Sequence, residues 1–235
     1  MTVIKGILFD KDGTLFDFAA TWEAWAKALL LRLSKGDRAQ AKRAAAAIAF
    51  DLDAGKFHPS SIAIAGTPSE IVEALAPHFP DHDYFSLLQV IDEEATAAPQ
   101  QPAVPLAPLL SELRARGLRL GVATNDSEAP ARAHLGQADV VELFDFIAGF
   151  DSGFGGKPAP GQLLAFAEAM DLDPTEVVMV GDSPHDLHAG RAAGMTCIGV
   201  LTGGATEAVL APLADVVLPD IGGLPNWLDR RAPQN

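Results

Sequence analysis

Two carboxylates stand two positions apart near the start of the chain, in the segment DKDGTL at residues 10–15. They directly follow a short apolar run, where a buried strand would deliver its last residues to a loop. Gly13 permits the backbone angles with which the chain could curl and bring Asp10 and Asp12 to one point. Such a pair could bind a hard cation or transfer protons. The alternative is a solvated acidic turn.

A second polar segment, residues 123–126, follows a later apolar run. Here the hydroxyl of Thr124, the amide of Asn125 and free backbone N–H groups could hold a phosphoryl oxygen. Thr and Asn also cap helices, so this segment alone does not decide between the two interpretations.

Two further segments add a cation and more carboxylates. Lys157 lies in GFGGKPAPG, a loop with glycines before the lysine and two prolines after it, and a lysine in such a loop is often only solvated. Asp182 and Asp186 stand four positions apart in GDSPHD, where Asp182 or Ser183 could instead cap a helix. Together, the four segments offer carboxylates for a hard cation, a hydroxyl and a lysine.

The elements that must position these residues alternate along the chain. Short apolar runs predict buried parallel strands at 3–10, 118–124, 146–150, 177–180, 197–201 and 216–218. Helical spacing occurs between them at 106–116, 130–135, 162–170, 186–193 and 207–213. This order predicts an α/β fold with a Rossmann-like parallel sheet covered on both faces. Ligands bind such sheets at the carboxyl ends of the strands, where the polar segments are expected.

Residues 17–98 interrupt this alternation. Helical patterns cover 21–33, 38–54, 69–78 and 84–97, and a proline-rich stretch at 99–108 leads back to the strands. We therefore predict a core formed by 1–16 and 99–235, with an inserted all-helical cap at 17–98 that could form a lid.

The composition restricts the partners. Seventeen Lys and Arg stand against 31 Asp and Glu, a formal net charge of -14 that would repel nucleic acid. An anionic substrate would therefore need a local positive centre, from a metal or a lysine. Cys197 is the single cysteine, which excludes an intrachain disulfide and favours the cytoplasm. No apolar stretch approaches the roughly 18 residues of a membrane span, so we expect no membrane association.

The set DKDGTL, TN, GKPAP and GDSPHDLHAGRAAGM, in this order and with a helical insert after its first member, resembles the haloacid dehalogenase superfamily, specifically its phosphoglycolate phosphatase-like branch. The resemblance covers almost the whole chain. It implies a phosphatase that acts on a small phosphorylated metabolite through an aspartyl-phosphate, with Mg²⁺ as cofactor and phosphoglycolate as a candidate substrate.

The resemblance also implies a role for each matching residue. Asp10 would attack phosphorus and Asp12 would serve as general acid and base. Thr124, Asn125 and Lys157 would bind the phosphoryl group, with Lys157 also balancing its charge. This fits the chemistry, because a carboxylate that approaches a phosphate dianion needs cations to offset their repulsion.

The magnesium site is implied in the same way. Asp10, the backbone carbonyl of Asp12 and Asp182 would bind Mg²⁺, which prefers a few oxygen ligands and retained waters. Asp186 would support the metal site or Lys157.

Two alternatives to a phosphatase stay open. An acid at Asp12 argues against a dehalogenase, which needs no protonated leaving group, but phosphomutases of the superfamily keep this acid. A non-catalytic binding protein on the same fold is the other alternative. The sequence does not distinguish a monomer from a dimer.

The cap should supply specificity. We expect Phe18, Trp22 and Trp25 to pack inside the cap rather than contact substrate, because they recur at helical spacing. Lys56 and His58 are polar groups that lid closure could carry over the site. The remaining histidines lack metal-ligand spacing and are expected at the surface or at helix caps: His78, His82, His134, His185 and His188.

Overall fold

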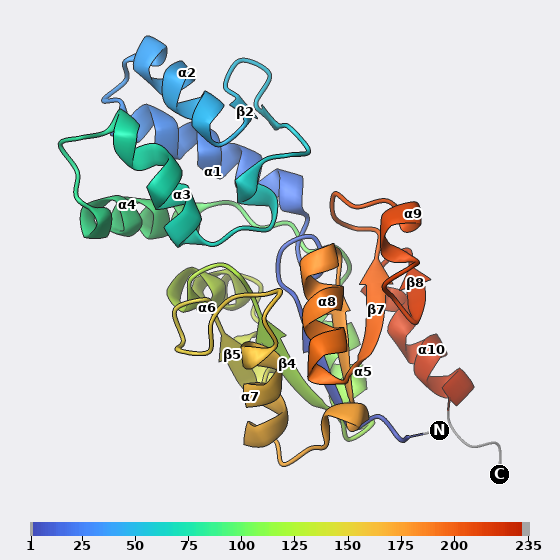
Figure 1. Ribbon diagram of the computed structural model, residues 1–235. Coiled ribbons are helices and arrows are strands. Elements are labelled where there is room, and N and C mark those ends of the chain that lie inside the picture. Colours follow the sequence, from blue (N-terminus) through green and yellow to red (C-terminus); the bar gives the residue numbers. More distant parts are fainter. Residues whose placement is uncertain (1, 232–235) are drawn as a thin grey trace.

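The computed structural model describes residues 2–231 of the 235-residue chain. Its centre is a six-stranded sheet with the order β5-β4-β1-β6-β7-β8, in which every neighbouring pair is parallel (Figure 1). The strands are β1 (Gly6–Phe9), β4 (Arg119–Ala123), β5 (Phe146–Ala148), β6 (Val177–Gly181), β7 (Thr196–Val200) and β8 (Val216–Leu218). The predicted α/β fold and its parallel sheet are confirmed, and each of the six apolar runs overlaps one strand to within one residue or contains it.

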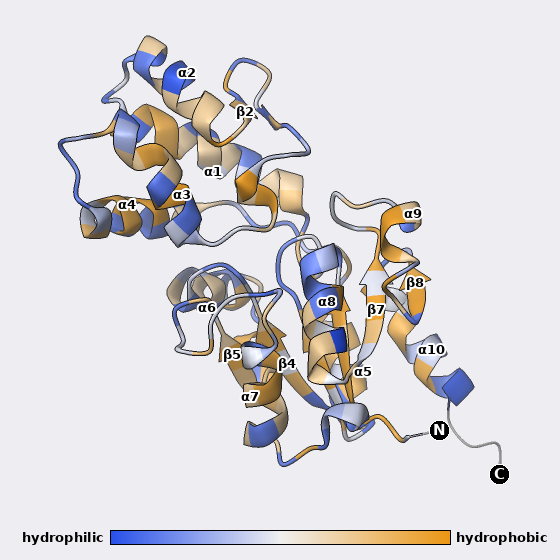
Figure 2. Cartoon of the chain, in the orientation of Figure 1, coloured by the Kyte–Doolittle hydropathy of each residue, from blue (hydrophilic) through white to orange (hydrophobic). Residues whose placement is uncertain are grey.

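Helices cover both faces of this sheet. They are α5 (Leu106–Ala115), α6 (Glu128–Gln137), α7 (Gly161–Ala169), α8 (Pro184–Ala193), α9 (Glu207–Leu210) and α10 (Leu224–Arg231). In β1, Ile7 and Phe9 belong to an apolar cluster with α5 and α10, whereas Leu8 packs with α7 and α8. The side chains of a strand alternate between the faces, so a continuous apolar run serves both layers. Figure 2 shows the resulting hydrophobic strands between helices with hydrophilic outer faces.

The insert forms a second body beyond the carboxyl ends of the strands (Figure 1). Its helices are α1 (Phe18–Leu33), α2 (Arg38–Ala47), α3 (Pro68–Leu75) and α4 (Tyr84–Ala97). Their buried apolar side chains form a cluster separate from those of the sheet. We keep the division into a core (1–16 and 99–235) and a cap (17–98) as a proposal, which the separate clusters support.

The prediction of an all-helical cap is wrong between α2 and α3. The helix expected over 38–54 ends at Ala47, and a short antiparallel hairpin follows, formed by β2 (Phe50–Asp51) and β3 (Lys56–Phe57). The backbone turns left-handed at Ala49, and the Asp51 carboxylate accepts hydrogen bonds from the N–H groups of Asp53 and Ala54. These local bonds compete with helix formation and explain why the helix ends.

Within residues 2–231, every helix is too short or too polar to cross a bilayer.

Candidate active site

Three strand ends meet at the centre of the sheet. In the register of the sheet, Phe9 pairs with Val122 on one side and with Val180 on the other. Asp10 is therefore level with Ala123 and Gly181, and Thr124 and Asp182 each follow one position further on. Their side chains line one pocket between the sheet and the cap.

Lys157 ties two of the carboxylates together. Its Nζ donates to Asp10 Oδ1 at 2.6 Å and to Asp186 Oδ1 at 2.6 Å, and the lysine side chain is 2% exposed. Burial alone would lower the pKa of Lys157, but the charges of Asp10 and Asp186 outweigh it and raise that pKa. The lysine is therefore a fixed cation beside the first motif.

The site holds more carboxylates than the single charge of Lys157 can neutralise. Burial raises the pKa of Asp10 to about 7, and the neighbouring carboxylates add to this rise while Lys157 opposes it. Burial and the charges of Asp10 and Asp186 also raise the pKa of Asp182 well above its usual range. A further positive charge, such as that of a bound cation, would stabilise the charged forms of Asp10 and Asp182.

The carboxylates fit a divalent cation. One oxygen from each of Asp10, Asp182 and Asp186 lies within 4.8 Å of the others, and all three residues are buried. Both oxygens of Asp186 already accept hydrogen bonds, one from Lys157 and the other from the N–H and hydroxyl of Ser183. Asp10 and Asp182 are thus the better candidates as ligands, and oxygen donors of this kind suit Mg²⁺.

Gly13 makes this arrangement possible. Its φ is +82°, in the left-handed region, and a Cβ atom there would lie 2.5 Å from Asp182 Oδ2. A side chain at position 13 would thus both strain the turn and displace the acidic group.

Thr124 and Asn125 use their side chains differently. Thr124 is buried at the pocket, and its Oγ1 accepts a hydrogen bond from the N–H of Asp126, which leaves the hydroxyl proton available. The Asn125 amide donates to the carbonyls of Ala65 and Lys157 and accepts from the Lys157 N–H. Asn125 therefore joins the cap to the loop that carries Lys157. Its predicted contact with substrate stays a prediction.

Lys11 forms a second buried cluster, which we did not predict. Its Nζ donates to Asp12 Oδ1 at 2.8 Å, lies 3.2 Å from Asp126 Oδ2 and donates to His134 Nδ1 at 2.9 Å. It also lies 5.3 Å from the centre of the Trp22 ring. Alternation along the chain is the signal that could have revealed it. If Asp10 and Asp12 face the site, the residue between them faces the protein interior.

The expectation that His134 lies at the surface or caps a helix is wrong. The residue is fully buried, because α6 turns it inward between Lys11 and the cap. An ammonium group can only donate, so Nδ1 accepts from Lys11 and Nε2–H donates to the carbonyl of Ala95 at 2.7 Å. Burial and the charge of Lys11 lower the pKa of His134 to about 4. A neutral histidine thus connects the core to α4. By contrast, His188 is exposed on α8, and His78 is partly exposed.

The cap forms the wall of the pocket opposite the strand ends. Phe18, Trp22 and Trp25 belong to the cap's apolar cluster, as expected, or pack against it, but all three also line the pocket. Lys56 and His58, the polar cap residues that lid closure could carry over the site, do not line this pocket. Lys56 pairs with Glu23 at 2.7 Å, and His58 bonds to Ser60 within its own loop.

Comparisons with known proteins agree with this geometry. Residues 4–194 match the family described as haloacid dehalogenase-like hydrolase. The chain is 37% identical over 120 residues to the phosphoglycolate phosphatase of Rhodospirillum rubrum, covering 51% of this chain and 50% of that protein. It is 38% identical over 127 residues to that of Neisseria meningitidis, covering 53% and 54%. The aligned region thus spans about half the length of these relatives.

Solved structures share the fold over nearly the full chain. An HAD phosphatase from Thermococcus onnurineus superposes with a TM-score of 0.68 at 24% identity, covering 96% of this chain and 98% of that one. A hydrolase from Pseudomonas syringae gives a TM-score of 0.67 at 21% identity, covering 97% and 99%. At these identities the likeness concerns the fold alone.

Proposed function

Because the chain belongs to the haloacid dehalogenase-like hydrolases, we propose that it is a magnesium-dependent phosphatase that hydrolyses a small phosphate monoester through an aspartyl-phosphate on Asp10. The observation that carries the proposal is the position of Lys157, whose Nζ lies 2.6 Å from Asp10 and from Asp186 at the strand ends. A fixed cation beside a carboxylate is what nucleophilic attack on a phosphate dianion requires.

In the first step, an Asp10 carboxylate oxygen forms a bond to phosphorus while the bond from phosphorus to the leaving oxygen breaks. Asp12 donates its proton to that oxygen, so the product leaves as an alcohol. Asp12 lines the same pocket, and its carboxyl is held by Lys11 at 2.8 Å. Asp10 then carries the phosphoryl group as an acyl phosphate.

In the second step, Asp12 takes a proton from water, whose oxygen attacks phosphorus. The bond between phosphorus and the Asp10 oxygen breaks, which restores the carboxylate and releases phosphate. Asp12 ends the cycle protonated, as it began, so the protons balance. This division into two displacements replaces one difficult step by two easier ones.

The other residues hold charge and position. Lys157 offsets the negative charge of the phosphoryl oxygens, and the Thr124 hydroxyl donates to one of them. Asp10, the Asp12 carbonyl and Asp182 would hold Mg²⁺, which when bound neutralises charge on the phosphoryl group. Asp186 keeps Lys157 in place through its 2.6 Å contact.

The names of the relatives supply phosphoglycolate as one candidate substrate. A small phosphate ester as the only partner, without nucleic acid or membrane, agrees with the net charge of -14. We also propose a cytoplasmic location, because a chain with a single cysteine forms no intrachain disulfide and suits a reducing compartment.

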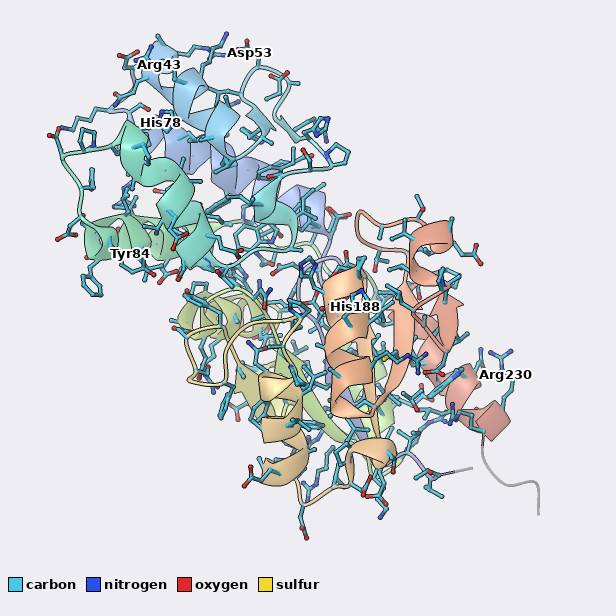
Figure 3. All side chains as sticks on the ribbon, in the orientation of Figure 1. Arg43, Asp53, His78, Tyr84, His188 and Arg230 are labelled. Atoms are coloured by element: carbon cyan, nitrogen blue, oxygen red, sulfur yellow. The ribbon has the colours of Figure 1, made fainter. Side chains whose placement is uncertain are left out.

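The test is phosphate release from a panel of phosphorylated metabolites and a generic aryl phosphate, with and without Mg²⁺. The natural chain is compared with Asp10→Asn and with Asp53→Asn. Asp53 is an exposed carboxylate at the far end of the cap (Figure 3), so its variant controls for the loss of one negative charge. We expect magnesium-dependent release that only Asp10→Asn abolishes. Equal release by Asp10→Asn would exclude Asp10 as nucleophile.

A further inference from the structure

Trp22 leaves a hydrogen-bond donor unused at the pocket. The residue is 8% exposed, it lines the pocket, and its buried Nε1–H has no hydrogen-bond partner within residues 2–231. Trp25, one turn of α1 further on, donates its own Nε1–H to the carbonyl of Ile91 at 3.2 Å. A buried N–H without an acceptor costs stability, so an acceptor on a bound ligand would satisfy Trp22.

The rest of the cap's pocket lining is apolar. Apart from small residues, it consists of Phe18, Trp22, Trp25, Ile64, Ile71 and Ile91, with Ile64 in the short 3-10 helix η1 (Ile62–Ile64). The described cap residues that line this pocket include neither an acid nor a base. This surface favours apolar groups and desolvates any charge placed against it.

The cations of the cap lie elsewhere. Every Lys and Arg of the cap is exposed: Lys27, Arg32, Lys35, Arg38, Lys42, Arg43 and Lys56. Several are paired on the outer surface, among them Arg32 with Glu93 and Glu94. Figure 3 shows Arg43 at the end of the cap away from the sheet.

The core side of the pocket is strongly acidic. Its lining contains Asp10, Asp12, Asp126, Asp182 and Asp186. Lys157 is the single lysine facing them within the described lining, and it already contacts two of these carboxylates. Lys157 and a bound divalent cation would be committed to the phosphoryl group, so a second anion on the substrate would face five carboxylates, with His185 as the one other basic side chain in the described lining.

The pocket is lined by both the cap and the core, and several hydrogen bonds join the two. The Asn125 amide donates to the carbonyl of Ala65 at 2.8 Å, and Ser127 donates to Asp92 at 2.8 Å. Helix α4 also packs on α6 (Figure 1). The apolar cap surface is therefore opposite the phosphoryl site in this arrangement.

We infer that the preferred substrate is a phosphate monoester whose leaving group is uncharged and largely apolar, and that the Trp22 indole N–H donates to one acceptor oxygen on that group. The inference rests on the proposed function and names its substrate class. It makes Trp22 a specificity-determining residue, and it disfavours leaving groups with a carboxylate, such as the glycolate of phosphoglycolate.

The test uses a matched pair of substrates, phosphoglycolate and its methyl ester, with ethyl phosphate as a third. The ester keeps the carbonyl acceptor but loses the charge, and ethyl phosphate lacks both. We expect kcat/KM for the methyl ester to exceed that for phosphoglycolate by about tenfold or more, because the charged group would be desolvated without a partner. Equal or higher kcat/KM for phosphoglycolate would overturn the inference and leave the phosphatase in place. Release from none of the esters, nor from an aryl phosphate, would overturn the proposed function itself.

The variant Trp22→Phe tests the donor, since it keeps an aromatic ring and removes the N–H together with the five-membered part of the indole. It should lower kcat/KM for the methyl ester about fivefold, the effect of one neutral hydrogen bond, and change ethyl phosphate much less. Trp227→Phe, in α10 and outside the pocket lining, is the matched control and should change neither. An equal loss for the methyl ester and for ethyl phosphate would show that Trp22 acts through packing and would overturn its assignment as a donor.

Discussion

Two buried lysines, Lys157 and Lys11, each pair with one aspartate of the first motif, and Lys11 itself belongs to that motif. Each lies between two aspartates: Lys157 between Asp10 and Asp186, Lys11 between Asp12 and Asp126. Their side chains are 2% and 0% exposed.

Only Lys157 lines the pocket, whereas Lys11 is also bonded to His134, which reaches the cap through Ala95. The same charge in the same kind of cluster therefore serves two purposes. In the proposed mechanism, Lys157 meets the phosphoryl group, whereas Lys11 fixes the proposed acid and base residue Asp12 and, through His134, the docking of the cap.

The sharpest way to separate the two lysines is Lys157→Met. Loss of this cation should lower kcat/KM by about 10³-fold, the upper end of the effect of one preorganised charge on a developing anion. The measurement is steady-state phosphate release at saturating Mg²⁺. A loss below about tenfold would show that Lys157 does not face the reacting group.

Lys11→Met should mainly affect stability. It leaves the buried Asp12 and Asp126 without their cation, which should lower the free energy of unfolding by about 3–5 kcal/mol. Urea unfolding measures this, with the exposed Lys27→Met as control. If the folded variant lost as much activity as Lys157→Met, the distinction between the two lysines would be wrong.

His134 should make the cap junction sensitive to acid. Burial lowers its pKa from 6.5 to about 4, so between these values the unfolded chain binds a proton that the folded chain does not. Its contribution to stability is therefore complete above pH about 6.5 and falls by about 3 kcal/mol as the pH drops to about 4.

In His134→Gln, which can still donate to Ala95, this part of the pH dependence should vanish from urea unfolding curves. Identical curves for the variant and the natural chain would refute a neutral, buried His134.

The smallest expected effect concerns magnesium. Since burial raises the pKa of Asp10 to about 7, a proton occupies this carboxylate at lower pH in the metal-free protein. Mg²⁺ needs the charged form, so its apparent affinity should weaken as the pH falls below about 7, by up to about tenfold per pH unit. Calorimetric titration at pH about 6 and about 8 measures the change. Equal affinity at both would mean that Asp10 is not a ligand.

The strands and the residues at their ends could be predicted from the sequence, because a strand buried on both faces is continuously apolar and the motifs follow directly. The hairpin at Phe50–Phe57 could not, since Ala-rich sequence continues the helical pattern past Ala47. Lys11 and His134 were missed because their burial depends on contacts between residues 123 positions apart. No local pattern shows that Trp22 lacks an acceptor among the residues that the structure describes, which follows only from the packing of α1 against the pocket.

The central claim is that Asp10 carries the phosphoryl group. Its most direct test is an acid quench of the enzyme during turnover of a labelled phosphate ester with Mg²⁺, followed by peptide mapping. We expect the label on the peptide that contains Asp10, and none in Asp10→Asn. Label on another residue, or continued turnover by Asp10→Asn, would contradict the account.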